Sequence, residues 1–446
     1  MFIKEVGNKA YDAAVVGTGP AGISLALRLA QQQGLRILLI ESGTPDYSPE
    51  ASKLSEVEAT GDLASSYYPV HAQRILGGTS SVWSGYCAVL EERAFINKEW
   101  PIAYSDLEPY YKDAADILEL PPEVYQTPSK PINGQSNILY KPYYLSPPVR
   151  FNEKYRTILS EHPTIDVIFN KTCTKVLTHE GTVQELLLKN SQGSIATTES
   201  VIAKQYILAC GGIGNARLLQ LSNIATDSPV GRYFTEHPHI YHGGMLELNQ
   251  DVIEPLLSSG RVVHALQLSD EVCAKHNVLS FSVSFQLDDI KEGFFLGRKK
   301  MVYASVGAIR SEMAQQANNR VSLSNNADHL GQAKANIDFA FSYEELGKKS
   351  WDILARELLA AGIGRASPPP MEAYSITGGG HYIGTTRMGT AQDNSVVDQN
   401  CKVHSTNNLY IAGSSVFASP GAANPTYSLV ALALRLADHL STNIHG

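Results

Sequence analysis

A glycine turn near the N-terminus has the spacing of a phosphate-binding loop. Gly17, Gly19 and Gly22 fit the pattern G-x-G-x-x-G. The first glycine allows a tight turn, the second lets a pyrophosphate approach the backbone, and the third lets a helix pack closely on a strand. Glu41 follows Gly22 at close to the usual spacing of about 20 residues, where a carboxylate binds a ribose hydroxyl and repels a 2′-phosphate. These residues predict a site for FAD or NAD and disfavour NADP.

Two polar residues near the other end of the chain could perform acid–base chemistry. His381 lies in the glycine-rich stretch 378–389, and Asn424 directly precedes Pro425. A histidine can take a proton from a hydroxyl group, and an asparagine can orient that group. On the residues alone, His381 is better explained as a histidine held in a glycine turn by backbone hydrogen bonds. Asn424 can equally be the N-cap of a helix that begins at Pro425.

A second glycine-containing loop, residues 74–85, has the composition of a cofactor contact. Its adjacent glycines, Gly77 and Gly78, are followed by a run of small hydroxyl residues. Without side chains, such glycines let the backbone lie flat against a ligand. A simple surface turn is the alternative, but the apolar residues that flank the loop, Trp83 among them, argue against it.

The elements that must position these loops follow from the apolar pattern. Around the first loop it predicts a strand at 13–16, a helix ending near Gly34 and a strand at 35–40. Six later segments alternate as strands and are expected to form an antiparallel sheet, followed by an amphipathic helix at 343–361. These six segments are residues 240–248, 262–268, 278–287, 301–309, 320–324 and 334–341.

Four strings together resemble the glucose–methanol–choline (GMC) oxidoreductases. They are LLIESG ending at Gly43, RILGGTSSVWSG beginning at Arg74, H-x-x-G-T-x-R-M-G beginning at His381, and G-x-x-N-P-T beginning at Gly421. The resemblance covers nearly the whole chain and is strongest at both ends. It implies an α/β fold, with a Rossmann-like FAD-binding domain and a substrate domain built on a six-stranded antiparallel sheet.

The resemblance also implies a division of the chain. The FAD-binding domain would comprise residues 1–90, 151–235 and 376–446, the last part carrying the catalytic residues. Residues 91–150 would be a helical and irregular cover, and residues 236–375 the substrate-binding sheet domain.

The family's site residues carry over to this sequence position by position. His381 would be the catalytic base and Asn424 would orient the substrate. FAD would be bound without a covalent link, because Val82 stands where some relatives carry a flavin-linked histidine. Fourteen residues would contact the cofactor: Gly17, Gly19, Gly22, Glu41, Arg74, Gly77, Gly78, Thr79, Ser80, Cys173, Gly413, Ser414, Pro425 and Thr426.

The function that follows is oxidation of an alcohol, which could be a sugar, a polyol or another hydroxyl compound, to an aldehyde or ketone. Oxygen or another acceptor would then reoxidise the flavin. A non-redox flavoprotein, such as a lyase or a decarboxylase, is the alternative that the resemblance leaves open. An NAD-dependent dehydrogenase rests on the first glycine motif alone, and the C-terminal strings argue against it.

Composition indicates which partners and which cellular location to expect. The net charge is −8 and no basic cluster stands out, so nucleic acid is not expected. No apolar run reaches the ~18 residues of a membrane span. Five scattered cysteines without a C-x-x-C indicate a reducing, cytoplasmic location. His237, His239 and His242 lack the spacing of metal ligands, so no metal is expected.

Overall fold

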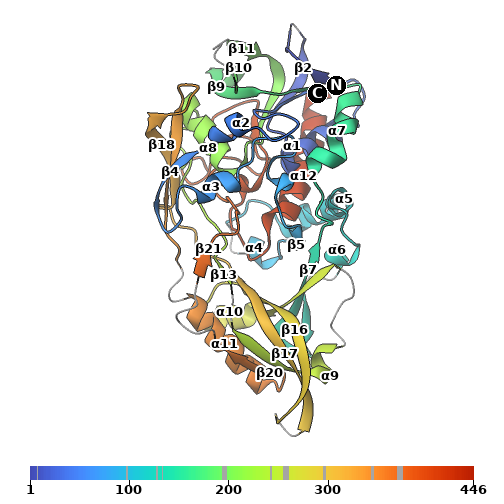
Figure 1. Cartoon of the computed structure of the whole chain (residues 1–446). Coiled ribbons are helices and arrows are strands. Elements are labelled where there is room, and N and C mark those ends of the chain that lie inside the picture. The colour runs from blue at the N-terminus through green and yellow to red at the C-terminus, as the bar shows by residue number, and fades with distance from the viewer. Residues whose placement is uncertain are drawn as a thin grey trace.

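The computed structural model describes residues 1–7, 9–96, 99–126, 129–132, 134–192, 198–241, 244–254, 261–294, 298–342, 346–368 and 375–445. Figure 1 shows an upper α/β body, which holds both ends of the chain, and a lower body built on long antiparallel strands. This arrangement confirms the expected fold class of a Rossmann-like parallel sheet with a second, antiparallel sheet.

The upper body is built on a parallel sheet whose strands come from distant parts of the sequence. Its order is β1-β8-β3-β2-β12-β22. Neighbouring strands are parallel throughout. The strands are β1 (Phe2–Ile3), β2 (Tyr11–Val16), β3 (Ile37–Ile40), β8 (Ile165–Ile168), β12 (Ala203–Leu208) and β22 (Leu409–Ile411). Because parallel strands end at one edge, this order brings loops from both ends of the chain together.

The first strand–helix–strand unit forms where the sequence predicts it. The side chains of β2 are buried except for that of Asp12, and β3 is buried along its whole length. Helix α1 (Pro20–Leu29) begins with Pro20, whose fixed φ suits a first helical residue. It packs against α12 (Pro425–His445), so the two helices that follow the N- and C-terminal motifs lie side by side (Figure 1).

The antiparallel sheet of the lower body has more strands than the sequence predicts. Within the described residues it has ten strands, with the main order β20-β14-β17-β16-β15-β7-β5. Helix α11 (Leu346–Ala360) packs on it through Trp351, Leu354 and Leu358. The strands are β5 (Tyr86–Cys87), β6 (Lys130–Ile132), β7 (Gln135–Leu145), β13 (His239–Tyr241), β14 (Met245–Asn249), β15 (Val262–Leu268), β16 (Phe281–Phe294), β17 (Arg298–Ser311), β20 (Gly364–Ser367) and β21 (Ser375–Thr377).

Two of the six predicted strands join a different sheet. Strands β18 (Arg320–Ala327) and β19 (Ala333–Phe339) form a hairpin, and β19 pairs in parallel with β4 (Val57–Gly61). Their apolar side chains pack in a separate cluster with Tyr68 and Phe234. Alternation predicts a strand but not its partner, and the partner β4 is distant in sequence. Residues 135–145, expected to be irregular cover, form the sheet strand β7.

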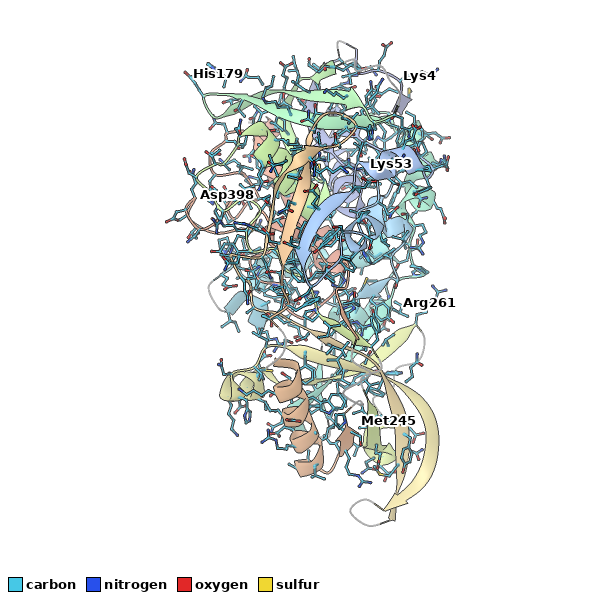
Figure 2. All side chains as sticks on the ribbon, turned by 60° about the vertical axis from the view of Figure 1, so that its left-hand side comes forward. Lys4, Lys53, His179, Met245, Arg261 and Asp398 are labelled. Atoms are coloured by element: carbon cyan, nitrogen blue, oxygen red, sulfur yellow. The ribbon has the colours of Figure 1, made fainter. Side chains whose placement is uncertain are left out.

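The remaining elements complete both bodies. Figure 2 shows the upper and lower bodies from another side, with Met245 on the lower sheet and His179 at the far end of the upper body. The other strands are β9 (Lys171–His179), β10 (Thr182–Asn190) and β11 (Thr198–Val201). The other helices are α2 (Pro49–Lys53), α3 (Tyr67–Val70), α4 (Arg93–Ile96), α5 (Glu108–Leu118), α6 (Glu123–Gln126), α7 (Phe151–Glu161), α8 (Gly211–Ser222), α9 (Gln250–Ile253) and α10 (Asp270–His276). Among the described helices, none is long and apolar enough to cross a membrane.

Candidate active site

A cavity of about 640 Å³ lies at the carboxyl edge of the parallel sheet. Val16 and Ile40, the last residues of β2 and β3, line it, as do Ala209 and Ala412, which directly follow β12 and β22. Arg310 of the large sheet lines it as well. The carboxyl edge of an open α/β sheet is where such folds bind their ligands, so this cavity is the candidate active site.

Three glycines leave room for a ligand in this cavity. A Cβ placed on Gly19, Gly211 or Gly413 would meet no atom within 4 Å. All three residues line the cavity. Their backbones can therefore be approached closely, and a side chain at any of these positions would occupy the space of the ligand.

Three helices begin at the cavity wall. Pro20 opens α1, Gly211 opens α8 and Pro425 opens α12, and all three residues line the cavity. The first-turn N–H groups of a helix have no partner within the helix, and the helix dipole is positive at this end. These N-termini can bind the phosphates of a dinucleotide and stabilise negative charge on a bound ring system.

Glu41 is buried at the end of β3, and hydrogen bonds hold its carboxylate in place. It accepts hydrogen bonds from the backbone N–H and the hydroxyl of Thr18, at 3.1 and 2.5 Å, and from the N–H of Gly43 at 2.8 Å. Burial raises the pKa of Glu41, while these donors oppose the rise. The carboxylate lines the cavity, and its remaining lone pairs can accept hydrogen bonds from a ribose.

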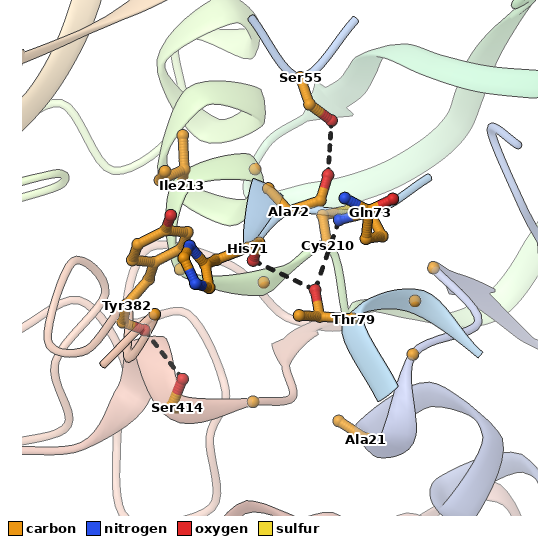
Figure 3. A pocket seen from close by; sticks show the side chains of 18 of the residues that line it. Ala21, Ser55, His71, Ala72, Gln73, Thr79, Cys210, Ile213, Tyr382 and Ser414 are labelled. Atoms are coloured by element: carbon orange, nitrogen blue, oxygen red, sulfur yellow. Dashed lines mark hydrogen bonds between the residues drawn. The ribbon is translucent and has the colours of Figure 1, made fainter. Parts of the chain in front are cut away.

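The loop that starts at Arg74 contacts the first glycine turn. A Cβ on Gly78 would lie 3.0 Å from the Cα of Gly19, so the two loops touch through their glycines. The Thr79 hydroxyl donates to the carbonyl of His71 and accepts from the N–H of Gln73 (Figure 3). These bonds fix the loop in the cavity wall.

Arg74 braces the loop rather than pairing with an acid. Its guanidinium donates to the hydroxyls of Ser55 and Ser42 and to the carbonyl of Leu54, at 3.1, 2.9 and 2.9 Å. Burial, followed by the charge of Arg217, lowers the pKa of Arg74 to about 10.

Most of the predicted site residues line the cavity, and two do not. The residues that line it are His381, Asn424, Gly17, Gly19, Glu41, Arg74, Gly78, Thr79, Ser80, Cys173, Gly413, Ser414, Pro425 and Thr426. The exceptions are Gly22 and Gly77. A Cβ on Gly22 would lie 2.1 Å from the carbonyl oxygen of Gly17, and one on Gly77 would lie 2.6 Å from the N–H nitrogen of Asn152. Both glycines serve close backbone packing instead.

His381 and Asn424 meet in the cavity, within a chain of hydrogen bonds. Nε2 of His381 is 3.1 Å from Nδ2 of Asn424. Nδ1 of His381 is 2.8 Å from Nδ1 of His237, whose Nε2 is 2.7 Å from the carbonyl oxygen of Gly421. The structure therefore connects the two predicted catalytic residues to a third residue, His237, at the cavity wall.

This chain determines the tautomer of His381. The carbonyl of Gly421 can only accept, so Nε2 of His237 carries a proton. In a neutral imidazole the other nitrogen is then an acceptor, so His237 accepts at Nδ1 and His381 donates from its own Nδ1. Nε2 of His381 is left with its lone pair, to which the Asn424 amide donates.

Burial keeps both rings neutral. It lowers the pKa of His237 to about 4. Burial first, then the neighbouring His237, His239 and Arg310, lower the pKa of His381 well below its usual value. At neutral pH Nε2 of His381 is therefore unprotonated and can take up a proton.

Glu236 supports the glycine turn that carries His381. Its carboxylate accepts from the N–H groups of Gly379 and His381, at 2.9 and 2.8 Å, and from the hydroxyl of Tyr67 at 3.0 Å. The side chain is buried, and burial raises its pKa to about 7 despite these donors. Glu236 therefore holds the turn in place and can change its charge near neutral pH.

The sequence alone indicates no catalytic role for the string that carries Glu236, His237 and His239. Of the three histidines that lack metal-ligand spacing, His242 lies outside the described residues. The spacing of His237 and His239 was the available signal, because alternate residues of an extended segment lie on one face. Both rings contact His381, with ring centroids 4.9 and 5.6 Å away.

Comparisons with known proteins agree with this architecture. A family profile for GMC oxidoreductases matches residues 315–433, and one for pyridine nucleotide-disulphide oxidoreductases matches residues 11–245. Among solved structures, pyridoxine 4-oxidase from Mesorbium loti has a TM-score of 0.59 at 17% identity, covering 96% of this chain and 99% of that chain. A variant of formate oxidase from Aspergillus oryzae RIB40 has a TM-score of 0.63 at 15% identity, covering 98% and 99%.

Two curated relatives match almost from end to end. Paromamine 6′-oxidase from Streptomyces fradiae is 24% identical over 96% of this chain and 91% of that protein. 2-Methyl-1,2-propanediol dehydrogenase from Mycolicibacterium austroafricanum is 22% identical over 96% and 95%.

The fold and the cavity thus define a dinucleotide-binding oxidoreductase. More narrowly, the chain belongs to the GMC oxidoreductase family, whose cofactor is FAD. The residues present suit that cofactor, because three open glycines, three helix N-termini and the Glu41 carboxylate all border one cavity.

Proposed function

We propose that this protein oxidises a hydroxyl compound at a CH–OH carbon, with His381 as the base and Asn424 as the orienting group. The observation that supports this most is the hydrogen-bonded chain from Gly421 through His237, which leaves Nε2 of His381 unprotonated. That nitrogen borders the same cavity as the glycines that would bind the cofactor.

Residues of the protein accept the proton that the substrate loses. FAD, when bound, supplies the acceptor for the hydride that leaves the substrate carbon. On binding, the substrate hydroxyl would replace the Asn424 amide at Nε2 of His381 and donate its proton there, and its oxygen becomes the carbonyl oxygen of the product. The Asn424 amide orients this oxygen by donating from Nδ2.

The environment of His381 stabilises the proton that it gains. When protonated, His381 still donates from Nδ1 to His237, now as a charge-assisted hydrogen bond. The Glu236 carboxylate, held by the backbone N–H of His381, places negative charge nearby.

FAD would be held without a covalent bond. Val82 lines the cavity at the position before Trp83, and its side chain has no atom that can form such a bond. The relatives named above are an oxidase and a dehydrogenase, so oxygen and another acceptor both remain candidates for reoxidation. Their names concern hydroxyl compounds, which supports a substrate of this class.

A lyase or decarboxylase is the second candidate, because the same base could serve a reaction without net oxidation. The test is to purify the protein, record the flavin bands and mix it anaerobically with a panel of sugars, polyols, aryl alcohols and hydroxy acids. Loss of the oxidised flavin absorbance with at least one compound is expected. A flavin that stays oxidised with every compound would contradict the proposal and favour the lyase.

A further inference from the structure

A buried arginine that has no acidic partner among the described residues borders the cavity beside the proposed base. Arg310 is only 6% exposed, lines the cavity and lies on β17. Within the described residues, its Nε and Nη1 atoms are buried without any hydrogen-bond partner. The guanidinium stacks on two tyrosine rings, at 4.6 Å from the centroid of Tyr86 and 5.4 Å from that of Tyr143.

Strand register places Arg310 on the same sheet face as His239. The two residues are direct partners across β17 and β13, and Thr377 of β21 continues the row. Directly opposed residues of antiparallel strands point to the same face. The ring centroid of His239 lies 5.6 Å from that of His381, and its buried Nε2 also has no hydrogen-bond partner among the described residues. The row therefore extends from the proposed base to the guanidinium.

Two other buried cations among the described residues are paired with carboxylates, and the buried guanidinium of Arg74 is satisfied by neutral acceptors. Lys141 lies 3.0 Å from a carboxylate oxygen of Glu91, and Arg217 lies 2.6 Å from one of Asp328. An unpaired buried charge is costly, since it loses its hydration without compensation. Aromatic stacking offsets part of this cost but leaves the Nε and Nη1 donors of Arg310 without an acceptor among the described residues.

We propose that Arg310 binds a carboxylate group of the substrate, so that the hydroxyl compound oxidised here is a hydroxy acid. This inference rests on the proposed function, since it names the substrate class of the same site. Arginine suits the role because its fixed fork of donors matches the planar carboxylate. His239 would supply a further polar contact through Nε2.

A bound carboxylate would also assist the proton transfer. An unpaired positive charge near His381 opposes the charge that this residue gains when it takes up a proton. The carboxylate of the substrate would neutralise Arg310 at the moment of reaction. A neutral alcohol of the same shape would leave that repulsion in place and react more slowly.

Binding of simple carboxylates tests the proposal without turnover. The FAD-loaded protein is titrated with acetate, succinate and benzoate and with the corresponding amides, and the shift of the visible flavin bands gives each Kd. In the wild type at least one carboxylate should bind about tenfold or more tightly than its amide, since charge-assisted hydrogen bonds are the stronger kind. Arg310→Gln should abolish this preference and Arg310→Lys should retain part of it.

Arg320→Gln is the matched control. Arg320 is half exposed and already lies 2.9 Å from the carboxylate of Asp338 on the neighbouring strand, so its loss should leave the carboxylate preference unchanged. Flavin content and thermal unfolding identify a variant that fails to load or fold. If Arg310→Gln loses its flavin, Arg310→Lys remains informative, because a shifted flavin potential with unchanged carboxylate preference would mean that Arg310 faces the cofactor.

Kinetics separate this inference from the proposed function. Hydroxy acids and their methyl esters are compared in anaerobic flavin reduction, and the acids should reduce the flavin faster at equal concentration. Reduction by neutral alcohols alone would overturn the role of Arg310 and leave the proposed oxidation of a hydroxyl compound intact. Carboxylate binding without flavin reduction by any compound would support the role of Arg310 and contradict the proposed oxidation. Equal binding of carboxylates and amides to the wild type, or no binding of either, would refute the inference.

Discussion

His237 offers a sharp test of the proton chain, because two substitutions each keep one of its two hydrogen bonds. The Oδ1 atom of His237→Asn can replace Nδ1 and still accept from His381. The Nε2 group of His237→Gln can replace the ring Nε2 and still donate to Gly421. Only the first substitution preserves the tautomer of His381 that leaves its Nε2 free to act as a base.

The size of the effect follows from the bond that is lost. In His237→Gln the Nδ1–H of protonated His381 loses an acceptor now 2.8 Å away. A hydrogen bond to a charged group contributes about 1.5–3 kcal/mol, which corresponds to roughly 10- to 150-fold in rate. His237→Asn should reduce the flavin at nearly the wild-type rate but lose about 1 kcal/mol of stability, since the carbonyl of Gly421 loses its donor.

Anaerobic stopped-flow reduction with a saturating substrate gives the rates, and thermal unfolding gives the stabilities. Each variant loses one buried hydrogen bond, so the two should lose similar stability, but His237→Asn should reduce the flavin faster than His237→Gln. If both variants lose rate in proportion to their loss of stability, His237 acts only as a packing residue and the tautomer argument fails.

Further predictions concern the cofactor, pH and potential. Gly19→Val should abolish FAD binding with the fold intact, because the new side chain points into the open cavity. Gly307→Val, at an exposed strand position, should keep its flavin. Flavin absorbance per mole of protein measures FAD binding in both variants. Because the pKa of Glu236 is about 7, its carboxylate forms as pH rises through 7 and should accelerate reduction there; a Glu236→Gln variant that keeps the same inflection would disprove this. Asn424→Asp should lower the flavin potential in a redox titration, by placing a carboxylate at the start of α12, and an unchanged potential would mean that this helix does not face the flavin.

The sequence was sufficient for the parts of the site that local patterns encode. Gly17 and Gly19 lie in a turn between a short apolar strand and an amphipathic helix, so local spacing predicts both the turn and its position. Pro425 likewise indicates where α12 begins, and Asn424 must then sit at the cavity edge. Gly22, the third glycine of the motif, packs against the carbonyl of Gly17, which is the close helix–strand packing that the motif predicts.

The rest depends on long-range pairing that no local pattern contains. Arg310 and His239 become neighbours only because β17 pairs with β13, and alternation in either strand is equally compatible with other partners. The same ambiguity explains why β18 and β19, which form a separate sheet with β4, were predicted to join the large sheet. The role of His237 depends on its contact with the ring of His381, which is distant in sequence and is brought near only by the fold.

The most direct test of the central claim is the rate at which a hydroxyl compound reduces the bound flavin in wild type and in His381→Ala. The substitution should leave the flavin bound, because His381 contributes a side chain to the reaction and its backbone N–H bond to Glu236 is retained. Anaerobic stopped-flow absorbance should show reduction slowed by about 10²–10⁴-fold, the usual contribution of a general base. If the rate in His381→Ala stays within about threefold of the wild-type rate, the loss is far smaller than a general base contributes. That result would remove His381 from the mechanism.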